Sequence, residues 1–380
     1  MGVPLPGSPA LPARLGAFYF VFFAYVAAYV AYFPLYLAGR GLDAREIAFI
    51  LALPSVARIF APAAWGWLAD RTGARGGIVT VACASMAACF AALPFFDALG
   101  IAVLIGITGI VSAGALPLVE TIAIGMPDGP RRYGPIRLWG SVGFVAVVFG
   151  GGIWLDYFAA ATVSPALALF ALASVVAAAT LPGGERHSVG ARLRLEVSPA
   201  ARSVLAAGFC MAVAHGALYA FFTLHLQGEG YSGTAIGALW TLGVLAEIAV
   251  FYYLPGLLRR FSLTTLLVFS FACAVVRFLV IAWASGALIL LVGAQLLHAA
   301  TFGTFHAASI AVVQRLFPAA AHARGQALFS SVAYGAGGAC GALAAGWAWD
   351  IAGAQLAFSV AALFGLAGAY FASRLRRAGL

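Results

Sequence analysis

Apolar runs of about twenty residues alternate with short polar stretches along almost the whole chain. A helix needs about 20 apolar residues to cross the hydrocarbon core of a bilayer. The pattern therefore predicts an all-α membrane protein with twelve transmembrane helices joined by short loops. We place the spans near residues 15–38, 46–69, 76–95, 98–122, 135–155, 163–181, 203–227, 234–256, 263–284, 286–311, 325–348 and 353–373.

The composition agrees with this pattern. The chain is 64% hydrophobic and only 9% charged, with a mean hydropathy of +1.02, whereas soluble domains carry about 25% charged residues. The first fourteen residues show neither a basic n-region nor a small-residue cleavage site, so we expect the first apolar run to remain as a span. The chain has no room for a soluble domain, and its surroundings are a lipid bilayer.

The net charge of +9 follows membrane topology. All 21 basic residues are arginines. With the N-terminus placed inside, sixteen of them fall in inside segments, two fall outside and three fall within spans. The positive-inside rule then predicts that both termini are cytoplasmic. The charge therefore gives no reason to expect a nucleic-acid partner.

The chain also divides into two similar halves. The long polar stretch at 181–202 separates a predicted six-helix bundle at 1–180 from a second at 203–380, with the stretch itself as a cytoplasmic linker. Residues 36–58 align with 225–247 at a constant offset of 189. Two repeated halves around a central linker are typical of secondary transporters.

The loop after the second predicted span reads GWLADRTGAR. Its residues Gly66, Asp70, Arg71, Gly73 and Arg75 match a signature of the major facilitator superfamily. Glycines permit a tight turn between helices, and the aspartate and arginines predict an ion-pair latch at a cytoplasmic gate. A generic basic loop would also contain arginines, but it would not show this spacing.

Six ionisable residues lie within or at the edge of the apolar spans. A charge at the centre of a bilayer costs roughly 2.5–3.5 kcal/mol on insertion scales. Several such residues in one chain therefore indicate pairing around something polar, which we take to be a solute and a proton. They are Arg58, Glu120, Arg137, Glu247, Arg277 and His298.

Arg58 and Glu247 occupy equivalent positions at the centres of the second and eighth predicted spans. They form either a structural ion pair that locks the halves together or a clamp for a substrate. Buried ion pairs often add little net stability, so a functional role is favoured.

Arg137 stands at the start of the fifth predicted span. It either snorkels to the cytoplasmic edge or pairs with Glu120 of the preceding span. Trp139, two residues further on, offers an aromatic plane to a ligand. Tyr25 and Tyr29 of the first span are candidates to flank the apolar body of a solute.

Arg277 and His298 lie in the middle of the ninth and tenth predicted spans. Histidine is the side chain best suited to reversible protonation near neutral pH. A neutral, hydrogen-bonded core histidine is the alternative for His298, but Arg277 and Glu247 on neighbouring spans weaken that alternative. His215 and Tyr219 share one face of the seventh span, and we assign both to substrate binding.

Several classes of protein and site are excluded. The five cysteines fall within predicted spans in an odd number, without metal-ligand spacing, so we expect buried thiols with neither disulfides nor a metal site. No Walker sequence occurs, so ATP hydrolysis does not drive the protein. No nucleophile–base motif is present, so we do not expect an enzyme. A proton is the expected coupling ion, with no cofactor.

Long segments carry a resemblance to a known family, and they cover nearly the whole chain. They are SVARIFAP (55–62), YGPIRLWGSVGF (133–144), AHGALYAFF (214–222), GYSGTAIGALWTLGVLAE (230–247), VVRF (275–278) and LLHAATFGTFHAA (296–308). The chain resembles the phenylpropionate permease family, proton symporters for aromatic acids within the major facilitator superfamily. The resemblance places Arg58, Arg137, His215, Glu247, Arg277 and His298 on family motif positions. Position 120 departs from the family, because Glu stands where the family has Asp.

A more distant resemblance is to lactose permease. Its acid of helix eight, arginine of helix nine and histidine of helix ten match Glu247, Arg277 and His298, and its substrate arginine of helix five matches Arg137. Three residues beyond the histidine, where lactose permease has its proton-carrying glutamate, this chain has Thr301. The resemblance therefore leaves Glu247 or His298 to carry the proton, unless coupling is lost.

Taken together, these features predict a secondary active transporter that moves a small organic acid, such as a phenylpropionate-like carboxylate, with a proton by alternating access. A sugar or nucleoside proton symporter is the alternative, followed by a non-transporting membrane sensor. We expect a monomer that crosses the bacterial inner membrane many times.

Overall fold

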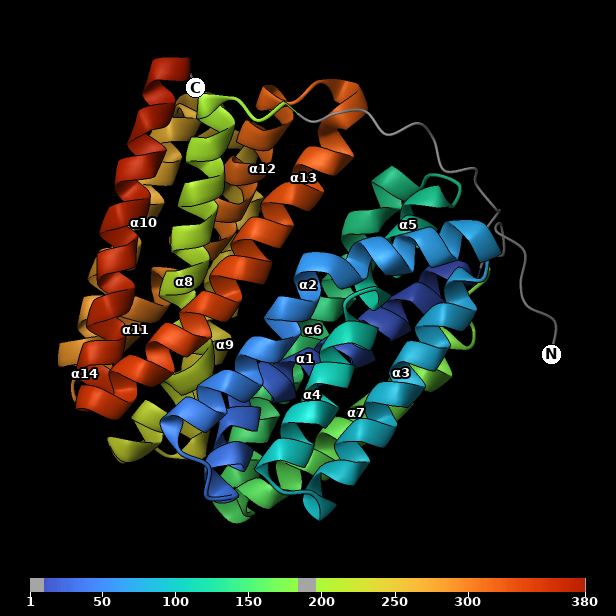
Figure 1. Cartoon of the computed structure of the whole chain (residues 1–380), viewed down its shortest axis with the longest axis vertical. Helices are drawn as coiled ribbons and strands as arrows, with labels where there is room; N and C mark the ends of the chain where they lie inside the picture. Colours follow the sequence, from blue (N-terminus) through green and yellow to red (C-terminus); the bar gives the residue numbers. More distant parts are fainter. Residues whose placement is uncertain (1–9, 184–195, 380) are drawn as a thin grey trace. The chain divides into compact units, whose positions relative to one another are not determined.

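The computed structural model describes residues 10–183 and 196–379 (Figure 1). Every regular element within these residues is helical, and eleven helices are long and apolar enough to cross a membrane. The last of them, His322–Arg376, has 55 residues and contains non-helical dihedral angles at Ala352 and Gly353. This break lies where the predicted eleventh and twelfth spans adjoin. The prediction of an all-α, many-helix chain is confirmed.

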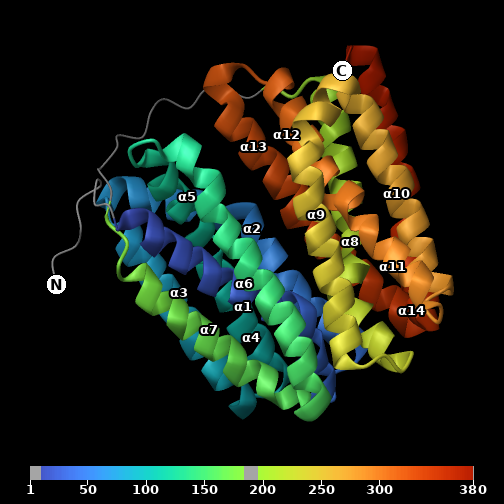
Figure 2. The same ribbon diagram turned by 180° about the vertical axis from the view of Figure 1, so that it is seen from behind.

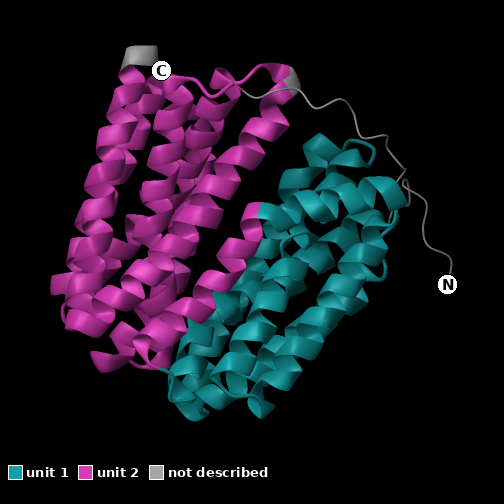
Figure 3. Cartoon of the chain, viewed as in Figure 1, with its two compact units in different colours: residues 1–42, 60–191 teal, residues 43–59, 192–380 magenta. Residues whose placement is uncertain are grey.

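The chain forms two compact units (Figure 3). Unit 1 contains residues 1–42 and 60–191, and unit 2 contains residues 43–59 and 192–380. Helix α2 (Ala44–Thr72) contributes its first part to unit 2 and the rest to unit 1. The predicted linker lies largely outside the described residues, and helix α8 already begins at Pro199.

Unit 1 is organised around α1, the most buried of its helices. This helix packs along α6 and α7, and α3 packs against α7. The hydroxyl of Ser164 on α7 donates to the carbonyl of Phe90 on α3 at 2.8 Å. In addition to its part of α2, unit 1 contains α1 (Leu11–Gly39), α3 (Arg75–Ala92), α4 (Ala98–Ser112), α5 (Ala115–Gly125), α6 (Gly129–Tyr157) and α7 (Val163–Ala178), with short 3₁₀ turns η1 (Leu93–Phe95) and η2 (Ala160–Thr162).

Unit 2 is organised around α8, which packs along α14 and is buried over most of its length; Figure 2 shows the bundle from behind. Two glycines make this contact possible. A Cβ atom added to Gly216 would lie 2.5 Å from the carbonyl oxygen of Gly341, so only the absence of side chains lets the two backbones approach this closely. The helices are α8 (Pro199–Gly228), α9 (Gly233–Arg260), α10 (Leu263–Trp283), α11 (Leu288–Leu296), α12 (Phe305–Leu316), α13 (His322–Ser330) and α14 (Gly338–Ser373).

The remaining elements of unit 2 are short. Two of them are π-helical turns inside long helices, η3 (Ala299–Thr304) and η5 (Ser331–Gly337). The other two are 3₁₀ turns, η4 (Ala319–Ala321) and η6 (Arg374–Ala378). π-Helical turns are rare and are frequent at functional sites, so η3 and η5 direct attention to the residues around them.

Serine caps begin three helices of unit 2. The side chains of Ser198, Ser232 and Ser262 accept hydrogen bonds from the backbone N–H groups three residues further on. Such caps satisfy one of the free donors at a helix N-terminus and stabilise it by about 1 kcal/mol. The starts of α8, α9 and α10 are thus encoded locally.

The sequence repeat is visible in the backbone. Gly41 follows α1 with φ of +81° and Gly230 follows α8 with φ of +84°, and these two glycines are 189 positions apart. Glycine adopts this left-handed conformation without steric cost. Matching hydrogen bonds close both turns, from Leu42 N–H to the Leu37 carbonyl and from Tyr231 N–H to the Leu226 carbonyl.

The cysteines are all free, but one expectation about them is wrong. Cys83, Cys89, Cys210 and Cys273 are buried, whereas Cys340 is exposed. Cys340 lies on α14, where its neighbour Ala339 is buried. The thiol points away from the packed face of the helix.

Candidate functional site

A largely buried acid–histidine pair joins two elements of unit 2. Glu247 on α9 has a carboxylate oxygen 3.7 Å from Nε2 of His298, which stands at the end of α11 immediately before η3. The exposed fractions of the two side chains are only 19% and 9%. Because a carboxylate only accepts hydrogen bonds, it favours a proton on Nε2 of the imidazole. The predicted proton-coupling residues Glu247 and His298 therefore lie side by side.

Arg277 on α10 completes the predicted proton-coupling group and is fully buried. Its Nη1 donates to the Thr301 hydroxyl at 3.2 Å, and its Nη2 donates to Oε1 of Gln295 at 3.1 Å. The two acceptors lie on η3 and α11. Gln295 was not among the predicted site residues, although a lone amide three positions before His298 lies on the same helical face as the histidine.

His215 and Tyr219 on α8 lie beside this group. The ring centroids of His215 and His298 are 6.3 Å apart. Tyr219 stacks on Trp240 of α9 with centroids 6.4 Å apart, and it lies within electrostatic reach of Glu247, Arg277 and Arg58. One cluster therefore gathers residues from α2, α8, α9 and α10.

Arg58 belongs to the part of α2 that lies in unit 2. Other residues in the described part of the chain do not cover its side chain, which is exposed. Tyr334 of η5 is in electrostatic reach of both Arg58 and Glu247. The opposite charges predicted from the repeat thus act on the same tyrosines.

A hydrogen bond joins α12, which follows directly on η3, to the π-helical turn η5. Nδ1 of His306, just beyond η3, lies 2.7 Å from the hydroxyl of Tyr334 in η5. Phe302 stacks between the rings of His298 and His306, with centroid distances of 5.5 and 6.2 Å. His306 and Tyr334 lie outside the predicted site, yet they continue the cluster along the helix.

Arg137 of unit 1 is half-buried on α6 and has aromatic neighbours. Its guanidinium carbon lies 3.9 Å from the ring centroid of Phe23 and 5.4 Å from that of Tyr19, both on α1. Glu120 on α5 accepts a hydrogen bond from the hydroxyl of Tyr133 at 3.0 Å. The structure therefore gives the predicted pair, Glu120 and Arg137, different direct partners.

The other aromatic candidates of unit 1 have packing roles. Trp139 is 54% exposed and its indole covers Gly16 of α1, where an added Cβ would lie 3.0 Å from the ring. Tyr25 packs against Phe90 with centroids 5.5 Å apart, and Tyr29 stacks on Phe33 at 4.9 Å. Their part in solute binding stays a prediction.

The cytoplasmic gate motif forms a structured turn. Asp70 and Arg75 make an ion pair of 3.2 Å across the loop, and Gly73 supplies the left-handed conformation with φ of +70°. Arg71 instead lies over the ring of Trp67 at 5.3 Å. Only one of the two arginines therefore contacts the acid.

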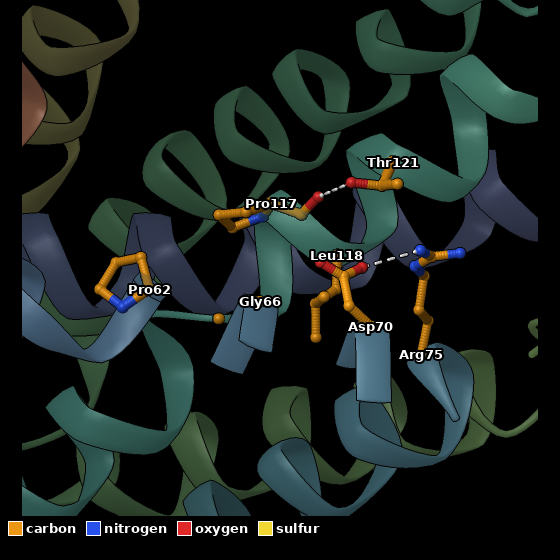
Figure 4. Close-up of a pocket in the computed structure, with 8 residues that line it drawn as sticks. Pro62, Gly66, Asp70, Arg75, Pro117, Leu118 and Thr121 are labelled. Atoms are coloured by element: carbon orange, nitrogen blue, oxygen red, sulfur yellow. Dashed lines mark hydrogen bonds and ion pairs between the residues drawn. The ribbon is translucent and has the colours of Figure 1, made fainter. Parts of the chain in front are cut away.

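A small cavity adjoins this turn between α2 and α5 of unit 1, with a volume of about 150 Å³ (Figure 4). Asp70 reaches toward Arg75 at one end of it, and Pro117 accepts a hydrogen bond from the Thr121 hydroxyl (Figure 4). Its lining residues are Pro62, Gly66, Asp70, Arg75, Gly114, Pro117, Leu118 and Thr121. Among the described residues, no group of three or more His, Cys, Asp or Glu side chains is arranged to hold a metal ion.

Comparison with known families identifies the fold. The MFS_1 like family matches residues 13–360, which is most of the chain. The chain belongs to the MFS_1 like family. This membership agrees with the loop signature at Asp70 and with the sequence repeat at an offset of 189, and it makes the protein a secondary transporter of the major facilitator type and not an enzyme.

Two curated relatives of this MFS_1 like transporter are similar over most of their length. A probable 3-phenylpropionic acid transporter of Escherichia coli (strain K12) is 29% identical over 330 residues, which cover 83% of this chain and 86% of the relative. Maltose permease of Geobacillus stearothermophilus is 27% identical over 376 residues, which cover 95% and 94%. The resemblance to phenylpropionate permeases is thereby confirmed.

Solved structures share the fold of this transporter. The nucleoside transporter NupG has a TM-score of 0.82 at 17% identity, and the match covers 96% of this chain and 99% of that one. A POT family transporter in complex with 5-aminolevulinic acid has a TM-score of 0.75 at 11% identity, with 98% of both chains covered. At such identities the likeness shows the fold alone.

Proposed function

We propose that the protein is a proton-coupled symporter for a small aromatic carboxylate of the phenylpropionate type, acting by alternating access. The similarity to a probable 3-phenylpropionic acid transporter supports the substrate class. The pair of Glu247 and His298 is the observation that carries the coupling. Protonation would remove the negative charge that faces His298, and a local change of charge of this kind biases a two-state conformational equilibrium.

We assign the carboxylate of the solute to an arginine. Arg137 is the first candidate because its planar guanidinium can bind a carboxylate through two hydrogen bonds. Its stacking on Phe23 holds that plane in one orientation and offers an apolar surface to an aromatic ring. Arg58 is the second candidate, because its exposed side chain is in electrostatic reach of Tyr219 and Tyr334.

The decisive test replaces Glu247 with glutamine, which keeps the shape and removes the titratable group. We expect Glu247→Gln to retain exchange of labelled 3-phenylpropionate across proteoliposomes and to lose accumulation driven by a pH gradient. Glu229→Gln is the matched control, because Glu229 also lies near a histidine, His225 at 4.0 Å, but at the end of α8. Uphill accumulation by Glu247→Gln would remove Glu247 from the coupling mechanism.

A sugar or nucleoside symporter is the second candidate, and the similarity to maltose permease over 95% of the chain favours it. Uptake of labelled 3-phenylpropionate and of maltose into the same vesicles separates the two functions. If neither solute, nor any member of a wider panel of acids and sugars, produces a proton flux, the protein is a non-transporting sensor instead.

We further propose a monomer with twelve spans in the bacterial inner membrane, both termini cytoplasmic, with the proton as its coupling ion and no cofactor. The break at Ala352 and Gly353 supports two spans within the last long helix, and the distribution of arginines supports the orientation. Tags at the two ends should be cleaved by protease in inverted vesicles and protected in right-side-out vesicles. Protection of one tag only in each preparation would indicate an odd number of spans.

A further inference from the structure

Four polar atoms in the cluster of unit 2 are buried and have no hydrogen-bond partner among the described residues. Unpartnered buried groups of this kind are few in native proteins, and each calls for an explanation. Two of the side chains, Arg277 and Gln295, are hydrogen-bonded to each other, and the rings of the two histidines have centroids 6.3 Å apart. The atoms are Nε of Arg277, Nε2 of Gln295, Nδ1 of His298 and Nε2 of His215.

The partners of these side chains fix what each free atom can do. Nδ1 of His215 lies 2.9 Å from the carbonyl of Met211, which only accepts, so Nδ1 carries the proton and Nε2 is an acceptor in the neutral ring. By the same reasoning, the carboxylate of Glu247 beside Nε2 of His298 leaves Nδ1 of that ring as an acceptor. The tautomer of His215 is assigned from its hydrogen bond, and that of His298 from the carboxylate that faces Nε2 at 3.7 Å.

The other two free atoms are donors. The amide oxygen Oε1 of Gln295 accepts a hydrogen bond from Arg277. The NH₂ group of Gln295 therefore points away from Arg277, and both of its hydrogens remain free to donate. Arg277 uses Nη1 and Nη2 and keeps its Nε–H free. The cluster therefore presents two donors and two acceptors.

We propose that this cluster binds a hydroxyl group of the solute and that Gln295 is the residue that determines this specificity. A hydroxyl both donates and accepts hydrogen bonds, so it can use both kinds of free atom. A carboxylate would meet the lone pairs of two imidazoles, and an ammonium would meet Arg277. The inference rests on the proposed function and narrows its substrate to a ring-hydroxylated aromatic carboxylate.

Charged and titratable groups surround the cluster on every packed element. Glu247 on α9 and Arg58 on α2 are both in electrostatic reach of Tyr219 on α8. His306 and Tyr334 follow on α12 and η5. On α9, Gly243 packs closely against the cluster, since an added Cβ would lie 3.3 Å from Oε1 of Gln295 and 3.5 Å from the His298 side chain.

The test compares two acids that differ by one hydroxyl group, 3-phenylpropionate and 3-(4-hydroxyphenyl)propionate, in proteoliposomes of the full chain. We expect the wild type to half-saturate with the hydroxylated acid at about a tenfold lower concentration, because a site built to pair a hydroxyl discriminates against an analogue that lacks it. Gln295→Leu should bring the two values together. Gln227→Leu, at the exposed end of α8, should keep the preference.

Gln295→Glu separates solute binding from the support that Gln295 gives to Arg277. A glutamate still accepts from Arg277, but it lacks the NH₂ donors, so the preference for the hydroxylated acid should again be lost. If Gln295→Glu keeps the preference, Gln295 acts only by positioning Arg277 and the proposal is overturned.

The two proposals fail in different ways. Equal half-saturation of the wild type by both acids overturns the hydroxyl site and leaves carboxylate symport standing. Uptake of maltose with no uptake of either acid overturns carboxylate symport. In that case the hydroxyl site is supported if Gln295→Leu weakens maltose uptake about tenfold, and overturned if it does not.

Discussion

The contact between α8 and α14 offers a quantitative prediction. In Gly216→Ala, the new Cβ would lie 2.5 Å from the carbonyl oxygen of Gly341 and 2.6 Å from the backbone nitrogen of Ala342. Ordinary contact begins near 3.4 Å, so the two helices must separate by about 1 Å. Both neighbours are backbone atoms, which cannot swing away as a side chain would. Overpacking of this kind costs about 1–3 kcal/mol.

The matched control is Gly293→Ala on α11, where an added Cβ meets nothing within 4 Å. Alanine is favoured over glycine in a helix by up to about 1 kcal/mol, so this variant should be as stable as the wild type or slightly more stable. Because both substitutions gain the same helix propensity, the two alanine variants should differ by the overpacking cost alone, about 1–3 kcal/mol in the free energy of unfolding.

The buried cysteines provide the assay. Cys83, Cys89, Cys210 and Cys273 are buried thiols in the folded chain, and a thiol-reactive fluorophore reports their exposure as detergent-solubilised protein is heated. Gly216→Ala should unfold at a clearly lower temperature than Gly293→Ala. Equal unfolding temperatures would refute the close approach of α8 and α14.

Two further predictions concern unit 1. Phe23→Leu removes the ring under Arg137, and a cation–π contact contributes about 0.5–2 kcal/mol. The half-saturation concentration for 3-phenylpropionate should therefore rise between about twofold and thirtyfold. An unchanged value would show that Arg137 does not bind the solute. Asp70→Asn should slow net uptake several-fold without changing solute affinity, because it breaks the ion pair with Arg75; equal initial rates for variant and wild type would show that the gate turn does not depend on this ion pair.

Much of the fold could be predicted because membrane burial imposes long apolar runs. The turns at Gly41 and Gly230 follow from a repeat that is readable in the sequence. Helix α6, however, begins at Gly129, earlier than the predicted start at residue 135. This extra turn is polar, with Arg131 and Arg132, so hydropathy alone does not detect it.

The extension of α6 also explains why one predicted pair acquired other partners. It makes Tyr133 helical and brings its hydroxyl to Glu120. Arg137, one turn further on, lies instead against Phe23 of α1. A charge in an apolar span could be recognised from sequence, but its neighbours depend on packing between helices that are distant in the chain.

Gln295 shows the other limit of sequence reasoning. An ionisable residue stands out in an apolar span because of its charge, whereas an uncharged amide such as Gln295 does not. Its importance depends on Arg277, which lies 18 residues earlier on a different helix. The signal that marks Gln295 in the sequence is its place three residues before His298, on the same helical face.

The π-helical turns η3 and η5 have a geometric consequence. A π-helical turn contains one residue more than the corresponding α-helical turn, and one residue of an α-helix corresponds to about 100° of rotation and 1.5 Å of rise. If η3 regularised to α-helix, the helix beyond it would change register, and His306 would present a different face to its neighbours. Because His306 is hydrogen-bonded to Tyr334 in η5, a register change in the helix that contains η3 would be transmitted to the helix that contains η5.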